Sequence, residues 1–178
     1  MAKNLPINLE LNIPKHPSEI LSFRKMVLGS ILAHRQLDVS EQQRIKLILI
    51  ELVTNTIKHA SGADSQIKLC IDHLTLTIHK LEKGMQIEFV SSGQQIPFEE
   101  IDKTISISFS EENKHQVKTL GKYEFEFLNP TQHGKEIDSI PEHFGFYIIT
   151  LASDSFIYQY DPKSKENRYT IKINIPGK

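Results

Sequence analysis

Three polar side chains recur at four-residue intervals in the segment ELVTNTIKHA: Glu51, Asn55 and His59. Residues four apart lie on the same side of an α-helix, so a helix here would stack a carboxylate, an amide and an imidazole in one row. At about 100° per residue, this row falls at the edge of a broad arc that would meet a core. The residues of that arc are Ile45, Ile48, Leu49, Leu52, Val53 and Thr56. The row predicts either the rim of a ligand cleft or the ordinary polar border of a surface helix.

The same segment resembles the first ATP-binding box of the histidine-kinase-like ATPase superfamily, which includes sensor histidine kinases, type II topoisomerases and mismatch-repair ATPases. The resemblance rests on the run ELVTN, from Glu51 to Asn55, and on the histidine and alanine that follow at 59 and 60. The most similar branch is that of the bacterial anti-sigma-factor serine kinases. In that branch, too, a strand ending in Ile-Pro, here Leu9 to Pro14, leads into a helix with an early arginine, here Arg24.

In that family the box glutamate is the general base that polarises the attacking hydroxyl, and the asparagine holds Mg²⁺. The resemblance therefore implies these roles for Glu51 and Asn55, with ATP and Mg²⁺ as cofactors. Phosphoryl transfer needs mainly a positioned base and a metal on the phosphate oxygens, and an amide oxygen is a suitable magnesium ligand. Lys58 and His59 would add positive charge or a hydrogen bond near the phosphates, with helix-end packing as the alternative for His59.

Two further boxes should complete the nucleotide pocket. In the family, a strand ends in Asp-x-Gly-x-Gly, and its aspartate binds the adenine amino group. Here the expected strand Met85–Val90 leads into SSGQQIP, which places Ser91 at the aspartate position, Gly93 at the first glycine and Gln95 at the second. A serine hydroxyl is a weaker acceptor than a carboxylate, so we expect reduced selectivity for adenine.

The third box normally reads Gly-x-Gly-Leu-Gly-Leu and opens a helix whose backbone amides hold the phosphates. The corresponding run is PEHFGF, in which Gly145 and Phe146 fit, whereas Pro141 and His143 replace the two earlier glycines. Glu142 would place negative charge close to polyphosphate, which is unfavourable without a neighbouring cation. The chain therefore either binds nucleotide in an altered way or keeps the fold with most of the affinity lost.

Composition points to one domain, residues 1–178, because 178 residues with 39% hydrophobic and 24% charged suit a single globular unit. A net charge of −1 without basic runs indicates neither a nucleic-acid nor a membrane partner. The sequence has no signal peptide and no apolar run of about 18 residues, so the expected compartment is the cytoplasm.

Cys70 is expected to be a packed, inert thiol. His115, His133 and His143 match no common zinc pattern and are expected on the surface.

Hydrophobic periodicity predicts an α+β fold, a two-layer sandwich in which helices cover one face of a mixed, mostly antiparallel sheet. The expected early elements are a strand at Ile7–Ile13, a helix from Pro17 to about Gln36, and a second helix from a capping box at Ser40 and Gln43 to about Ala60.

The later part of the chain adds two hairpins and two helices to this prediction. The expected elements are a hairpin of Leu74–Leu81 with Met85–Val90, a short helix from Pro97 to Ile101, a helix from His143 to about Ser153, and a hairpin of Phe156–Tyr160 with Arg168–Ile175. Residues 104–140 occupy the position of the family's lid, and their strand-like alternation predicts a structured insertion.

The resemblance implies a regulatory serine/threonine kinase that binds ATP and Mg²⁺, sequesters a partner such as a sigma factor and phosphorylates an antagonist protein. The alternative is a non-catalytic module of the same fold that acts by binding a protein partner, with a homodimer also allowed. A detached histidine-kinase catalytic domain fits less well, because no helix with a phosphoacceptor histidine precedes the domain in this sequence.

Overall fold

The structure, a computed structural model, describes residues 7–59, 65–72, 74–90, 95–111, 113–129 and 145–176. The helices are α1 (Ile20–Leu32), α2 (Val39–His59) and α3 (Gly145–Ala152), with a 3₁₀ turn η1 (Pro17–Glu19) before α1. The strands are β1 (Ile7–Asn12), β2 (Ser65–Asp72), β3 (Thr75–Lys83), β4 (Thr104–Ser108), β5 (Lys114–Gly121), β6 (Glu124–Phe127), β7 (Ser155–Asp161) and β8 (Glu166–Asn174).

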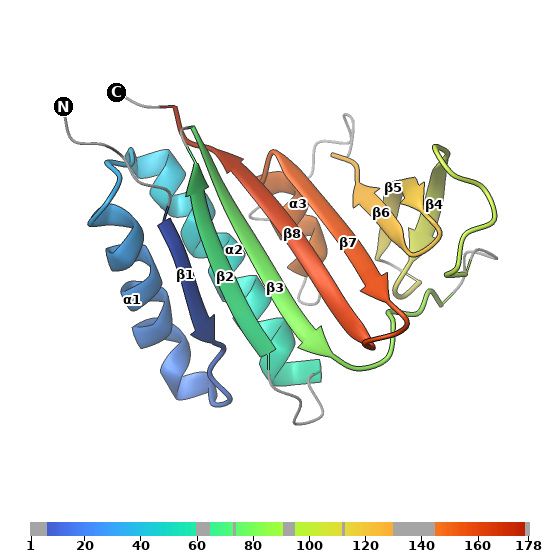
Figure 1. Ribbon diagram of the computed structural model, residues 1–178, viewed down its shortest axis with the longest axis horizontal. Helices are drawn as coiled ribbons and strands as arrows, with labels where there is room; N and C mark the ends of the chain where they lie inside the picture. The colour runs from blue at the N-terminus through green and yellow to red at the C-terminus, as the bar shows by residue number, and fades with distance from the viewer. Residues whose placement is uncertain are drawn as a thin grey trace.

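All these strands form one eight-stranded sheet in the order β1-β2-β3-β8-β7-β6-β5-β4, with the helices on one face (Figure 1). The predicted α+β class is confirmed. The predicted mixed sheet is wrong for the described residues, because every neighbouring pair in the sheet is antiparallel. Short hairpin connections join β2 to β3, β4 to β5, β5 to β6 and β7 to β8, and such connections permit only antiparallel pairing.

Helix α2 carries the predicted core arc, since Ile45, Ile48 and Leu49 have no exposed surface. Its first turn is fixed by a capping box at Asp38 and Glu41 rather than at Ser40 and Gln43 as predicted. The Glu41 amide donates to Asp38 Oδ1 at 2.8 Å, and the Asp38 amide donates to Glu41 Oε2 at 2.7 Å. Each carboxylate accepts a hydrogen bond from a backbone amide that the helix itself leaves unpaired. The helix therefore begins at Val39, before Ser40.

The predicted hairpin of Leu74–Leu81 with Met85–Val90 does not form. Strand β3 pairs with β2 along one edge and with β8 along the other, so neither edge remains for residues 85–90. Residues 85–89 have no regular secondary structure, and residues 97–101, predicted as a helix, form bends. Phe89 and Phe98 nevertheless anchor this irregular chain, because both rings are buried and stack with centroids 6.3 Å apart.

The insertion is structured as predicted over its described part, where β4, β5 and β6 extend the sheet beyond β7 (Figure 1). Residues 130–140 lie outside the described chain.

The surface position predicted for His115 is wrong, since this residue is buried and its Nε2 lies 2.6 Å from Asn113 Oδ1. The rings of Phe109 and Phe127 each lie 5.4 Å from the imidazole. His133 and His143 lie outside the described residues, and Cys70 is a half-buried free thiol.

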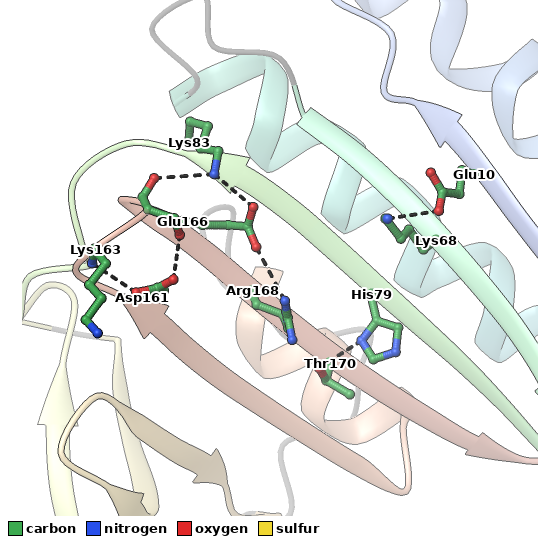
Figure 2. A network of polar contacts seen from close by, with 10 residues as sticks. Glu10, Lys68, His79, Lys83, Asp161, Lys163, Glu166, Arg168 and Thr170 are labelled. Atoms are coloured by element: carbon green, nitrogen blue, oxygen red, sulfur yellow. Dashed lines mark hydrogen bonds and ion pairs between the residues drawn. The ribbon is translucent and has the colours of Figure 1, made fainter.

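The face of the sheet opposite the helices carries polar side chains paired between neighbouring strands (Figure 2). Lys68 is 2.8 Å from Glu10, and Lys83 is 3.0 Å from Glu166. His79 Nδ1 lies 3.0 Å from the Thr170 hydroxyl, and its pKa is lowered by partial burial and by the nearby cations of Arg168, Lys172 and Lys68. Antiparallel sheets commonly keep one such solvated face. Among the described residues no helix is long and apolar enough to cross a membrane.

Acid should destabilise the fold through His115. Burial lowers its pKa to about 4 from an ordinary value of 6.5. The unfolded chain therefore takes up a proton between these pH values that the folded protein does not, and the free energy of unfolding falls as the pH falls through this window. We expect a loss of roughly 3 kcal/mol by pH 4, and a smaller loss in His115→Gln. Chemical denaturation at several pH values measures the free energy of unfolding of both proteins. If this free energy changed equally with pH in the two proteins, His115 would not be the source of the acid sensitivity. The exposed His34→Gln variant is the control and should follow the unmodified protein.

Candidate functional site

A cavity of about 480 Å³ lies where α2, the end of β3 and the start of α3 meet. One wall is polar and comes from α2, with Glu51, Asn55 and Lys58. The lining also includes two aromatic rings, Phe109 and Phe146. Small-molecule sites typically have volumes of roughly 300–1,000 Å³ and combine apolar walls with a few polar groups. The size and lining therefore suit an organic ligand with a planar apolar part and a charged part.

The start of α3 approaches the polar wall so closely that any side chain at 145 would require Glu51 and Asn55 to shift. A Cβ on Gly145 would lie 2.9 Å from Glu51 Oε2, 2.9 Å from Asn55 Nδ2 and 3.1 Å from Asn55 Oδ1. These two side chains stand one turn apart on α2 and converge on the first residue of α3. The carboxylate, the amide and the helix start thus form a cradle that a larger residue at 145 would fill.

Glu51 is half-buried in this cradle. Loss of water around the carboxylate raises its pKa, and the positive charge of Lys58 opposes that rise. A carboxylate with a raised pKa is a stronger proton acceptor than an exposed one, which is the property that a general base needs. The geometry and the electrostatics of Glu51 therefore both suit proton transfer within the cavity.

Away from the cradle, the cavity is bordered by a charged pair from β3. Lys80 Nζ lies 2.7 Å from Glu82 Oε2, and the hydroxyl of Tyr169 donates to Glu82 Oε1 at 3.1 Å. The Lys80 ammonium also lies 4.9 Å from the centroid of the Tyr169 ring. Burial lowers the pKa of Lys80, an effect that the Glu82 carboxylate opposes, and burial raises the pKa of Tyr169 well above its usual range. Tyr169 is therefore a neutral donor to Glu82.

The structure brings five of the predicted site residues to this one cavity: Glu51, Asn55, Lys58, Gly145 and Phe146. His59 is the last residue of α2, and its side chain lies outside the described part of the chain. Ser91 and Gly93, predicted to border the adenine, also lie outside it. The strand that was expected to precede them is absent from residues 85–89, so the predicted strand-then-glycine arrangement does not occur there.

Sequence reasoning missed Lys80, Glu82 and Tyr169. A signal for Lys80 was present, because alternation along β3 places it on the same face as Leu76 and Ile78, both fully buried. Glu82 also had a signal, since Glu82-Lys83-Gly84 has the acid-x-glycine spacing expected of the second box and follows a strand-like run. Nothing local in the sequence indicated that Tyr169 would reach the same cavity, because this contact depends on the pairing of β3 with β8.

No model of a known protein family matches the sequence, and no curated protein matches it.

Replacing Gly145 by alanine should disturb the cradle. The added Cβ would crowd the side-chain ends of Glu51 and Asn55. Overpacking typically costs about 1–3 kcal/mol of stability, and we expect the lower end here because these side-chain ends can rotate away. The matched control is Gly29→Ala in α1, where a Cβ would meet nothing within 4 Å and helix propensity favours alanine by roughly 0.5–1 kcal/mol. Thermal unfolding of both variants tests this contrast. Equal stability of the two variants would show that the close approach at 145 is not a constraint.

Replacing Lys58 by methionine should raise the pKa of Glu51 further, because the variant removes the charge that opposes the effect of burial. Titration of the glutamate carboxyl carbons by NMR measures this directly, with the Glu51 signal identified by its loss in Glu51→Gln. The control is Lys46→Met, which alters a lysine of the same helix that does not line the cavity. A Glu51 pKa that is unchanged in Lys58→Met, or lowered, would contradict the electrostatic description.

Proposed function

We propose that this protein binds a nucleotide with Mg²⁺ in the cavity and acts as a regulatory protein resembling the anti-sigma-factor serine/threonine kinases. The observation that carries the proposal is the convergence of Glu51, Asn55 and Gly145. The family resemblance assigns these residues to one nucleotide pocket, although Gly145 is far from the other two in the sequence. Their contact in the fold is the arrangement that a functional pocket of this type requires.

Asn55 would hold Mg²⁺ through its amide oxygen, together with phosphate oxygens and water. The close approach at Gly145 supports this assignment, because it brings the Asn55 amide, the Glu51 carboxylate and the first residue of α3 together at the cavity wall. The bound ion would supply positive charge to the phosphate oxygens. Glu51 would accept the proton of a serine or threonine hydroxyl on the protein partner, and Lys58 would add positive charge near the phosphates.

Glu82 and Gly84 are our candidates for the second box in place of Ser91 and Gly93. Glu82 lines the cavity near the end of β3, and its carboxylate is an acceptor for a base. Gly84 has φ of 154°, a conformation that other residues rarely adopt, so the turn after the strand requires glycine. Phe109 and Phe146 would offer ring surfaces to the base.

The second candidate function is a partner-binding module that keeps the fold without catalysis. The replacement of two third-box glycines by Pro141 and His143 favours it, because proline donates no amide to a phosphate. Under either function the expected partner is a protein of the sigma-factor or antagonist type in bacterial signalling. The expected compartment is the cytoplasm, and a homodimer is allowed.

Calorimetric titration of the full chain with ADP and with GDP, each with Mg²⁺, tests the binding proposal. We expect saturable binding, and we expect Asn55→Ala to lower the magnesium-dependent affinity by at least about tenfold, as loss of a metal-positioning group typically does. Gln43→Ala removes an exposed amide from the same helix and should leave the affinity unchanged. Absence of binding for both nucleotides at millimolar concentration would reject the proposal.

Catalysis is tested separately with Glu51→Gln, which keeps the shape of the side chain and removes the base. We expect nucleotide affinity to stay within about twofold, and release of the γ-phosphate of ATP or GTP, to protein or to water, to fall by about 10²–10⁴-fold. Radiolabelled ATP and GTP, tested in parallel, measure both routes. Equal rates in the two proteins, or no release by the unmodified protein, would leave the non-catalytic module as the function.

A further inference from the structure

We propose that Lys80 and Glu82 recognise the base of the bound nucleotide and favour guanine over adenine. This inference rests on the proposed nucleotide function of the same cavity and specifies which nucleotides it takes. The resemblance implies ATP, whereas the chemistry of the Lys80–Glu82 pair matches the edge of guanine better. Both side chains line the cavity, so a bound base would meet them directly.

Lys80 lies in the protein interior, and Glu82, whose side chain is 20% exposed, lies at its edge. Lys80 is only 4% exposed, and its Nζ lies 2.7 Å from Glu82 Oε2. The Tyr169 hydroxyl holds the second oxygen of Glu82 at 3.1 Å, and Tyr169 is itself 3% exposed. Lys80 and Tyr169, from two neighbouring strands, thus fix the orientation of the Glu82 carboxylate at the cavity wall.

Stability alone gives a weak reason for a charged pair at this place. The cost of removing two charges from water offsets most of their attraction, so buried ion pairs are often no more stabilising than apolar residues of similar size. Leu76 and Ile78 fill the preceding positions on the same face of β3, which shows that apolar side chains suit this layer. A charged pair that continues such a face and borders a cavity is therefore better explained by recognition of a polar ligand.

The pair still has hydrogen-bonding capacity for a ligand. A lysine ammonium has three N–H donors, and Glu82 is the only acceptor that Lys80 contacts within the described residues. A carboxylate accepts about four hydrogen bonds, of which Lys80 and Tyr169 use one at each oxygen. A ligand therefore meets free donors on Lys80 beside free acceptor positions on both oxygens of Glu82.

Guanine presents one acceptor and two donors in a row along one edge: O6, N1–H and the 2-amino group. Lysine commonly binds guanine through O6, and the two donors can pair with the two oxygens of one carboxylate. Adenine presents one amino donor beside the N1 acceptor, so it can engage only one oxygen of Glu82. Guanine thus gains one additional charge-assisted hydrogen bond at this pair.

Affinities of the full chain for GDP, IDP and ADP, each measured by calorimetry with Mg²⁺, test the inference without altering the protein. IDP lacks the 2-amino group and keeps O6 and N1–H. We expect GDP to bind tightest, IDP to bind more weakly because it lacks one hydrogen bond to Glu82, and ADP to bind at least about tenfold more weakly than GDP. ADP binding as tightly as GDP, or IDP equal to GDP, would overturn the inference.

A double variant extends the test, since Lys80→Met alone would leave Glu82 without its buried partner. Lys80→Met with Glu82→Gln removes both charges and places an amide at 82, which offers one donor and one acceptor, the pattern that pairs with adenine. We expect the preference to shift toward ADP by about tenfold or more. Circular dichroism establishes that the variant is folded; a folded variant that still prefers GDP would contradict the role of the pair.

The matched control is Lys83→Met, because Lys83 belongs to the same strand but pairs with Glu166 on the open face of the sheet (Figure 2). It should leave the order of affinities unchanged, and a shift as large as in the double variant would also contradict the inference. The two proposals fail differently. Absence of binding for all three nucleotides would reject the proposed function together with this inference, whereas binding that favours ADP would reject only the inference.

Discussion

The close approach of α3 to α2 is the constraint on which the candidate site depends. Because Gly145 has no side chain, the first turn of α3 can lie against Glu51 and Asn55, and a Cβ there would come within 2.9 Å of both. Helix α2 is held in place by its fully buried arc against the sheet, while the short helix α3 is followed directly by β7. The two helices therefore meet at a position that the sheet determines, and the cavity lies beside this contact.

A second feature of the site is the contrast between its two charged regions. Glu51 is half-buried with a pKa raised by loss of water, whereas Glu82 is held by a lysine and a tyrosine. One carboxylate is thus available to accept a proton, and the other is fixed in orientation. The difference arises from the surroundings of the two residues: Glu51 on α2 is half-buried beside the cavity, and Glu82 near the end of β3 is paired with Lys80 and Tyr169.

Helical periodicity in the sequence was sufficient to predict α2, its buried arc and the placement of Glu51 and Asn55 at its edge, because these depend on local spacing. The terminal hairpin of β7 and β8 and the helix beginning at Gly145 were predictable for the same reason. The partners of β3 were not, because residues 85–90 alternate like a strand and only the competing β2 and β8 exclude them from the sheet. Tyr169 could not be predicted as a site residue for a related reason: its contact with Lys80 and Glu82 depends on that long-range pairing.

The position of a bound nucleotide is the most direct test of the proposed site. Titration of ¹⁵N-labelled protein with GDP and Mg²⁺, followed by NMR, identifies the residues whose environment changes. We predict that the Gly145 backbone amide and the Asn55 side-chain amide shift most, together with amides of β3 near Glu82. Shifts confined to the open face around Lys68 and His79, or the absence of any shift at saturating nucleotide, would contradict a nucleotide site between α2 and α3.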